Sequence, residues 1–303
     1  KFYFFNDLDI KKKLDFEKKV NLNKTLFFII SKSGGTTETL SNTFSINIIK
    51  KNAKNVILIS ERKNNFLYAL SKKNNLFYIE HKNSIGGRFS VLSEVGIVPA
   101  FLMGVNIFKL RSKTLKFLKG KSKIFLESSC IKLSDLLCSR KINNLIFINY
   151  VPELDKFLFW SQQLIAESLG KKGKGFLPMV SNAPKDHHSL LQLYLDGPKD
   201  KIYYIFSCNE NSKKKIVINK NISQIKSYLD KKKISEVKNA QIKALIEVFK
   251  IKKIPFREFK INKINEESLS ELFSYFILET IIVGKLSKIN PYDQPAVETV
   301  KIL

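Results

Sequence analysis

The stretch TLFFII-SKSGGTTETL, residues 25–40, indicates how this chain folds. A strand-length apolar run passes into small hydroxyl residues and two glycines, and then into a segment with helical character. In open parallel α/β folds, ligands bind beyond the carboxyl ends of the strands. We therefore expect residues 31–36, the hydroxyl loop, at a binding edge, either as an ordinary helix-capping turn or as an anion site.

Apolar runs of strand length alternate with helix-period segments along the rest of the chain. The runs are FYFFN (2–6), TLFFIIS (25–31), VILIS (56–60) and LFYIE (76–80), then NLIFINY (144–150), KIYYIFS (201–207) and IPFREFKI (254–261). Such alternation predicts mainly parallel sheets with helices on both faces, a three-layer αβα arrangement. We place a seam at LKGKSKIFLESS (118–129), which gives domains at 1–118 and 119–303.

The charge is strongly basic, with 53 Lys+Arg against 27 Asp+Glu and a net charge of +26. A nucleic-acid or membrane partner is one interpretation. The lysines are dispersed over expected loops and helix ends, without a basic stripe interleaved with aromatics, so we expect neither partner. Cys130, Cys138 and Cys208 have no metal-site or disulfide spacing. With no secretory leader and no membrane-length apolar run, we expect a cytoplasmic location.

The hydroxyl loop has the chemistry of an anion site. Ser31, Ser33 and Thr36 offer hydroxyls, Lys32 offers a positive charge, and the glycines allow a tight turn. The following helix would add free N–H groups and the positive end of its dipole. A phosphate monoester suits this environment, whereas the stretch does not match a nucleotide P-loop.

Two further clusters carry charged groups. Arg88 follows Gly86 and Gly87 in IGGRF, which favours a role at a site, although pairing with a surface carboxylate is the usual fate of an arginine. Gln163 and Glu167 in FWSQQLIAESLG stand four apart and share one helix face. Glu167 is then either a solvated carboxylate or a general base in a polar cavity.

The remaining candidate site residues are histidines and residues of the last segment of the chain. His187 and His188 are adjacent, but no second ligand pair exists for a metal, so a proton-transfer role is the better interpretation. His81 has no evident companion. Gln294 and Lys301 share a face if DQPAVETVK is helical, and otherwise Lys301 is a solvated terminal lysine.

In order and spacing, these motifs resemble those of the glucose-6-phosphate isomerase (phosphoglucose isomerase) family. SKSGGTTET resembles its sugar-phosphate loop, IGGRFSVLSEVG its first signature and QQLIAESLGK its catalytic-glutamate segment; HHSLLQLYLDGP and DQPAVETVK resemble its histidine and C-terminal segments. The resemblance implies two sugar-isomerase-type domains. It also implies reversible conversion of glucose 6-phosphate and fructose 6-phosphate through ring opening and an enediolate, without metal or organic cofactor.

The resemblance also implies a role for each matched side chain. Those that would hold the sugar phosphate are Ser31, Lys32, Ser33, Thr36, Gln163 and Gln294. Glu167 would be the base, and Arg88 would lie near the C1 and C2 oxygens. His188 and Lys301 would pass a proton during ring opening. The family forms homodimers with shared sites, so His188 would be lent by the partner chain.

The chain also departs from the family pattern. The family has an upstream glycine-rich turn of the form GIGGS, and this sequence begins after it, at KFYFFND. We therefore expect an N-terminally truncated chain, and the activity of these residues alone stays open. Three alternatives also stay open: another sugar-phosphate isomerase or synthase of the same domain type, a non-catalytic sugar-phosphate-binding regulator, and a nucleic-acid-binding protein.

Overall fold

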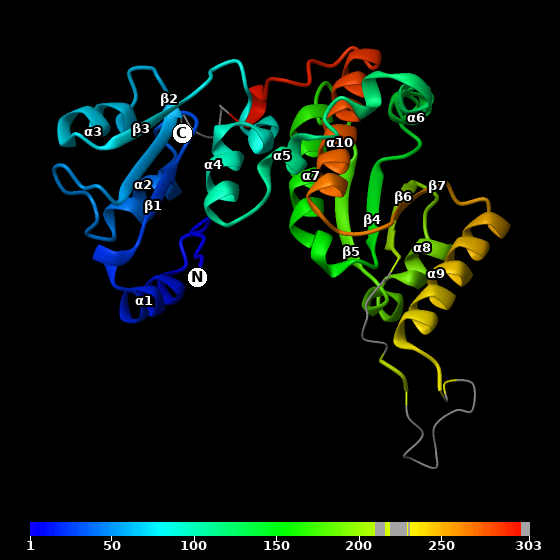
Figure 1. Cartoon of the computed structure of the whole chain (residues 1–303). Coiled ribbons are helices and arrows are strands. Elements are labelled where there is room, and N and C mark those ends of the chain that lie inside the picture. Colours follow the sequence, from blue (N-terminus) through cyan, green and yellow to red (C-terminus); the bar gives the residue numbers. More distant parts are fainter. Residues whose placement is uncertain (210–215, 219–228, 230, 298–303) are drawn as a thin grey trace. The chain divides into compact units, whose positions relative to one another are not determined.

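The computed structural model describes residues 1–209, 216–218, 229 and 231–297. The chain divides into two compact units, Lys1–Ile107 and Phe108–Leu303. Each unit contains a parallel sheet with helices packed on it (Figure 1). The predicted fold class is therefore confirmed.

The first unit is built on three parallel strands, β1 (Phe27–Ile30), β2 (Val56–Glu61) and β3 (Phe77–His81), in the order β1-β2-β3. All three coincide with apolar runs predicted as strands. The helical elements around them are α1 (Ile10–Lys19), η1 (Leu22–Lys24), α2 (Thr37–Phe44), α3 (Phe66–Asn74), η2 (Gly87–Leu92) and α4 (Glu94–Leu102). The short α5 (Ile107–Arg111) spans the division between the units.

The core of the first unit explains one wrong prediction. Val56 and Leu58 of β2 are fully buried in a cluster that includes Phe16 of α1. FYFFN (2–6) was predicted as a strand, but these residues form none. The rings of Tyr3 and Phe5 instead pack edge-on against Phe16, at centroid distances of 5.0 and 5.1 Å. The aromatic alternation therefore reflects packing on a helix and not strand pairing.

The second unit is built on four parallel strands in the order β5-β4-β6-β7. They are β4 (Asn144–Asn149), β5 (Leu177–Asn182), β6 (Lys201–Cys208) and β7 (Phe256–Ile261). The helical elements are η3 (Lys116–Leu118), α6 (Gly120–Ser139), η4 (Pro152–Leu154), α7 (Asp155–Leu169), η5 (Lys185–His188), α8 (Leu191–Asp196), α9 (Ile234–Ile251) and α10 (Glu266–Leu286).

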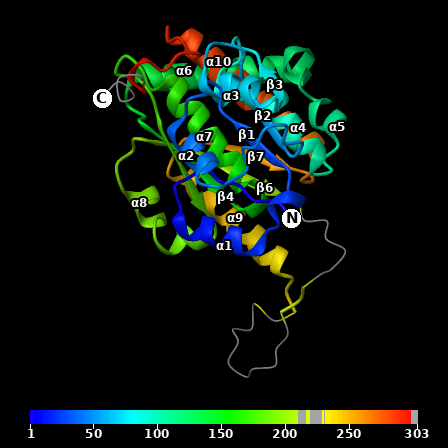
Figure 2. The same ribbon diagram turned by 90° about the vertical axis from the view of Figure 1, so that its left-hand side faces the viewer.

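Alternating side chains direct the two faces of this sheet into different helix layers. Tyr203 of β6 packs on Phe249 of α9 with a centroid distance of 4.8 Å, and α9 lies beside β6 in both views (Figures 1 and 2). On the other face, Phe147 of β4 packs on Phe276 of α10 at 6.1 Å, and Phe157 of α7 reaches the same ring at 5.4 Å. The second unit is therefore a three-layer αβα sandwich.

The division between the units comes before the boundary predicted at residue 118. Residues 108–118 bond to α10: the Lys113 backbone N–H donates to Ser270 Oγ at 3.0 Å, and Ser274 Oγ donates to the Thr114 carbonyl at 2.7 Å. Most residues of the predicted boundary segment, 120–129, form the start of α6. Its buried face has helical spacing and consists of Leu126, Cys130, Leu133 and Leu137.

The long helix α10 is apolar round much of its circumference, and the chain itself covers part of this surface. Phe276 and Val283 are fully buried, and α10 packs against both α6 and α7. Arg257 of β7 adds a buried ion pair with Glu279 and hydrogen bonds to the hydroxyls of Tyr204 and Tyr275. Leu286 at the end of α10 is nevertheless 49% exposed, so the chain does not cover the whole apolar surface of this helix.

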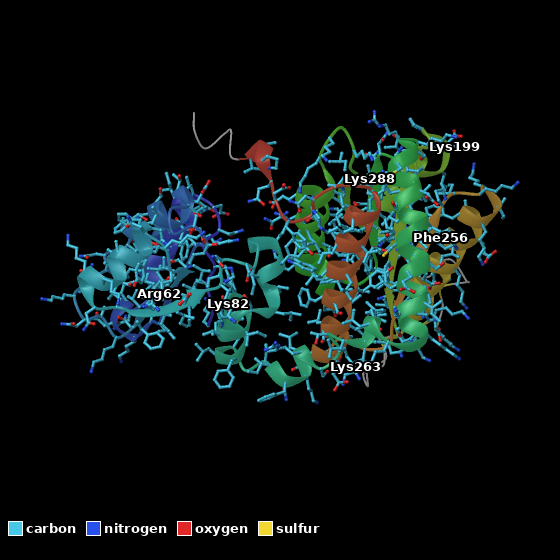
Figure 3. The ribbon with its side chains drawn as sticks, turned by 90° about the horizontal axis from the view of Figure 1, so that it is seen from above. Arg62, Lys82, Lys199, Phe256, Lys263 and Lys288 are labelled. Atoms are coloured by element: carbon cyan, nitrogen blue, oxygen red, sulfur yellow. The ribbon has the colours of Figure 1, made fainter. Side chains whose placement is uncertain are left out.

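The basic charge is spread over separate turns. Lys82 follows β3, Lys199 precedes β6, Lys263 lies between β7 and α10, and Lys288 follows α10; all four are exposed (Figure 3). Within the described ranges, none of the helices is long and apolar enough to span a membrane.

Candidate active site

The hydroxyl loop connects β1 to α2 and has a defined internal geometry. Ser31 Oγ and Thr36 Oγ1 lie 2.7 Å apart, and the Thr36 backbone N–H points at Ser31 Oγ at 3.4 Å. Ser31 is buried, whereas Ser33 and Thr36 are exposed next to the first turn of α2. The loop therefore presents hydroxyls and helix N–H groups to solvent at a strand end, as an anion site requires.

Lys32 connects this loop to the carboxyl ends of the other two strands. Its Nζ lies 3.4 Å from Glu61 Oε1 at the end of β2 and 3.4 Å from the Asn83 carbonyl after β3. Glu61 is almost completely buried, and its other oxygen lies 2.8 Å from Lys63 Nζ. Burial raises the pKa of Glu61, but the two lysines outweigh it, so the pKa lies below its usual value. Glu61 is therefore the anionic partner of Lys32 in this structure.

Arg88 lies in η2, directly after Gly86 and Gly87, and is only 4% exposed. Its guanidinium carbon is 5.2 Å from the centre of the Phe89 ring. Ser90 Oγ donates to the Gly87 carbonyl at 2.7 Å, which closes the turn. Arg88 is thus a buried cation carried by a closed turn.

Gln163 and Glu167 lie on one face of α7, as their spacing predicts. Gln163 Nε2 donates to Glu167 Oε1 at 2.9 Å. Glu167 is half-buried near the C-terminal end of the helix, which stops at Leu169 before Gly170. The bond fixes the position of one carboxylate oxygen of Glu167.

The segment that carries Gln294 is tied to the end of α7. Lys171 Nζ lies 2.8 Å from Asp293 Oδ1 and also donates to the Asn290 carbonyl. The ion pair with Lys171 lowers the pKa of the Asp293 carboxyl. Gln294 is half-buried beside this pair, and a helical turn begins directly after it. Lys301 lies outside the described residues.

The two adjacent histidines have different surroundings. His187 Nε2 lies 2.7 Å from the hydroxyl of buried Tyr150, and burial, followed by the neighbouring His188, lowers the pKa of His187. Asp186 holds the same turn by accepting bonds from Ser181 Oγ at 3.0 Å and from the Asn182 N–H at 2.8 Å. His188 is exposed at the end of η5. One histidine therefore holds the turn, and the other faces outward.

The candidate residues form local groups in each unit. In the first unit, Lys32 links the hydroxyl loop to the segment that contains Arg88. In the second, Gln163 bonds Glu167, and the Lys171–Asp293 pair places Gln294 near the same helix end. The sequence motifs did not indicate Glu61 or the His81–Glu94 contact, because each joins a strand end to residues that only the fold brings close. No group of three metal-ligating side chains occurs among the residues that the structure describes.

Comparison with known proteins identifies the family. The family model described as phosphoglucose isomerase matches residues 1–303. A probable glucose-6-phosphate isomerase of Methanococcus maripaludis is 35% identical, over 98% of this chain and 68% of the relative. The glucose-6-phosphate isomerase of Methanocaldococcus jannaschii is 34% identical, over 99% and 75%. The identity therefore extends over nearly the whole of this chain.

Solved structures agree on the fold. A hypothetical protein of Thermus thermophilus, TT0462, matches with a TM-score of 0.85 and 24% identity, over 99% of this chain and 75% of that one. A glucose-6-phosphate isomerase of Chlamydia trachomatis matches with a TM-score of 0.71 and 17% identity, over 98% and 61%. Since the family model covers the whole chain and a relative is 35% identical over 68% of its own length, this chain belongs to the phosphoglucose isomerase family.

Proposed function

We propose that this chain catalyses the reversible isomerisation of glucose 6-phosphate to fructose 6-phosphate, a step of glycolysis and gluconeogenesis. The observation that carries the proposal is the match of the phosphoglucose isomerase family over residues 1–303, with relatives of that name at 34–35% identity. We also expect the reaction to take place in the cytoplasm and to need no cofactor.

We assign the phosphate of the substrate to the hydroxyl loop. Ser33 and Thr36 are exposed beside the N–H groups that open α2, and Ser31 orients Thr36 through their 2.7 Å contact. Lys32 would exchange its contact with Glu61 for the phosphate dianion, a short movement for a flexible side chain. The assignment is supported by the coincidence of hydroxyls, helix start and lysine at one strand end.

We assign the proton transfer between C1 and C2 to Glu167. In open-chain glucose 6-phosphate the carboxylate removes the C2 proton and the electron pair forms the enediolate. The proton then returns to C1, while the hydroxyl proton of C2 passes to the C1 oxygen. Gln163, which already donates to Glu167, would orient the carboxylate and contact a sugar hydroxyl. Negative charge develops on the C1 and C2 oxygens, so a fixed cation such as Arg88 would stabilise the transition state more than the ground state.

Ring opening needs a second proton path, since the sugar arrives closed. The C1 hydroxyl must lose a proton and the ring oxygen must gain one. We assign this transfer to His188 and Lys301, with Gln294 holding the sugar. The support for His188 is its exposed position on a turn that neighbouring groups hold in place.

A coupled dehydrogenase assay with the intact protein tests the function. Fructose 6-phosphate should be converted to glucose 6-phosphate, and Glu167→Gln should remove the signal. The rival interpretation, another sugar-phosphate isomerase or synthase, predicts no turnover of fructose 6-phosphate and turnover of a different phosphosugar in the same panel. Binding without turnover of any phosphosugar would indicate a regulator.

We also propose a symmetric homodimer in which His188 of one chain completes the site of the other. We place the interface on apolar surface that the chain leaves exposed. Ile124, Phe125 and Ile131 of α6 are each more than half exposed and offer one candidate. Mixing Glu167→Gln with His188→Ala should restore activity, since one site of a mixed dimer then carries neither change. Continued inactivity despite subunit exchange would place both residues of a site in one chain.

A further inference from the structure

His81, which is buried, and Glu94, which is partly exposed, form a pair that joins the two ends of the arginine segment, residues 82–93. His81 is the last residue of β3 and is 1% exposed; Glu94 is the first residue of α4. The Nδ1 atom of His81 contacts a Glu94 carboxylate oxygen, and its Nε2 lies 3.1 Å from the Ile85 carbonyl. One imidazole therefore connects the strand end, the segment and the following helix.

The hydrogen-bond chemistry makes this connection specific. A carbonyl oxygen only accepts, so Nε2 donates to Ile85. Nδ1 therefore makes its bond to the Glu94 carboxyl group, and both ring nitrogens have a partner. Breaking these bonds is costly for His81, because its buried ring would be left with unsatisfied polar atoms. The ring therefore restricts the segment at its base.

Bonds within the segment transmit this restriction to Arg88. The Ile85 N–H donates to the Lys82 carbonyl at 3.1 Å, and the Phe89 N–H donates to the Gly86 carbonyl at 2.9 Å. Ile85, which His81 holds, thus ends one closed turn, 82–85, and directly precedes a second, 86–89. Arg88, 4% exposed, is carried by this turn.

We propose that His81 and Glu94 are positioning residues that hold Arg88 where the enediolate oxygens develop charge. The inference rests on the proposed function, in which Arg88 stabilises that charge. A cation acts on a transition state only if it is already in place, and a displacement of about 1 Å can cost about a hundredfold in rate. The pair thus extends the arginine site to two residues that do not touch the substrate.

Steady-state kinetics on the intact protein, with fructose 6-phosphate as substrate, test the proposal. His81→Phe fills a similar volume but loses both hydrogen bonds, and it should lower kcat about 10- to 100-fold with little change in KM. Glu94→Leu should give a loss of the same size. Glu94→Gln keeps a partner for Nδ1 and should stay within a few-fold of wild type. If His81→Phe does not fold, Glu94→Leu and Glu94→Gln provide the same comparison.

Two controls separate positioning from mere stability. Ile48→Ala removes a buried core residue of the same unit outside the arginine segment, and it should lower the unfolding temperature without lowering kcat. In an Arg88→Lys background, His81→Phe should cause no further loss, because it acts through the arginine. Losses that multiply in the double variant, or an unchanged kcat in His81→Phe and Glu94→Leu, would overturn the inference.

The outcome for the wild-type protein separates the two proposals. Wild-type turnover together with unaffected His81 and Glu94 variants would refute the positioning role alone. Absence of wild-type turnover would refute the proposed function, and the positioning role with it.

Discussion

Gly34→Ala is the substitution whose effect can be worked out most directly from the structure. Gly34 has φ +69°, and a Cβ built on it would lie 2.0 Å from Asn65 Oδ1 and 2.4 Å from Asn65 Cγ. Asn65 cannot move away without loss. Its Oδ1 accepts the Tyr68 N–H at 2.9 Å and so caps α3, and its Nδ2 donates to the Glu61 carbonyl at 2.6 Å.

The expected cost is the sum of two terms. A non-glycine residue in the left-handed region costs about 1–2 kcal/mol. Displacing the N-cap of α3 costs about 1 kcal/mol more. Gly34→Ala should therefore lower the free energy of unfolding by about 2–3 kcal/mol. Gly35→Ala is the matched control, since its Cβ meets nothing within 4 Å and its φ lies outside the positive range. It should change stability by less than about 0.5 kcal/mol.

Hydrogen exchange measured by mass spectrometry locates the effect. Peptides from the hydroxyl loop and from α3 should lose protection in Gly34→Ala and keep it in Gly35→Ala. The KM for fructose 6-phosphate should rise in the first variant only. Equal protection in the two variants would show that the left-handed turn and the Asn65 contact do not constrain this loop.

Three other substitutions address the catalytic assignments and the charge balance of the loop. Glu167→Gln keeps an acceptor for Gln163 but no base, so kcat should fall about a hundredfold or more with KM nearly unchanged; wild-type turnover would exclude Glu167 as the base. Arg88→Lys replaces a planar fork with a point charge and should lower kcat more than it raises KM; an effect on KM alone would limit Arg88 to ground-state binding. Glu61 has a folded pKa below its reference value of 4.5, so its ionised form adds stability above pH 4.5 that is lost as the pH falls through the folded pKa. The urea concentration at the midpoint of unfolding should therefore fall less steeply with decreasing pH in Glu61→Gln than in wild type. An equally steep fall in both would contradict the burial of a paired carboxylate there.

Local sequence patterns predicted the elements that depend on local geometry. The runs that became β1, β2, β4 and β6 are mainly apolar stretches, as buried parallel strands require. The runs that became β3 and β7 also carry charged residues, and both strands lie at sheet edges. The Gln163–Glu167 contact was predictable because a spacing of four places two side chains on one helix face.

The features that the sequence did not predict depend on contacts between residues distant in the chain, or on a residue type that is tolerated only at a sheet edge. LPMVSN contains Pro178 and was not predicted as a strand, yet it forms β5 at the edge of its sheet, where a missing N–H is tolerated. The His81–Glu94 and Tyr150–His187 contacts join residues 13 and 37 apart, so no periodicity marks them. The family motifs supplied the remaining roles.

Deuterium incorporation tests the central claim, that this chain isomerises a hexose phosphate by proton transfer through Glu167. The intact protein is incubated with fructose 6-phosphate in D₂O, and the recovered hexose phosphates are analysed by mass spectrometry and NMR. The account predicts carbon-bound deuterium at C2 of glucose 6-phosphate with wild type, and a background level with Glu167→Gln. Turnover without any carbon-bound deuterium, or wild-type incorporation by Glu167→Gln, would contradict it.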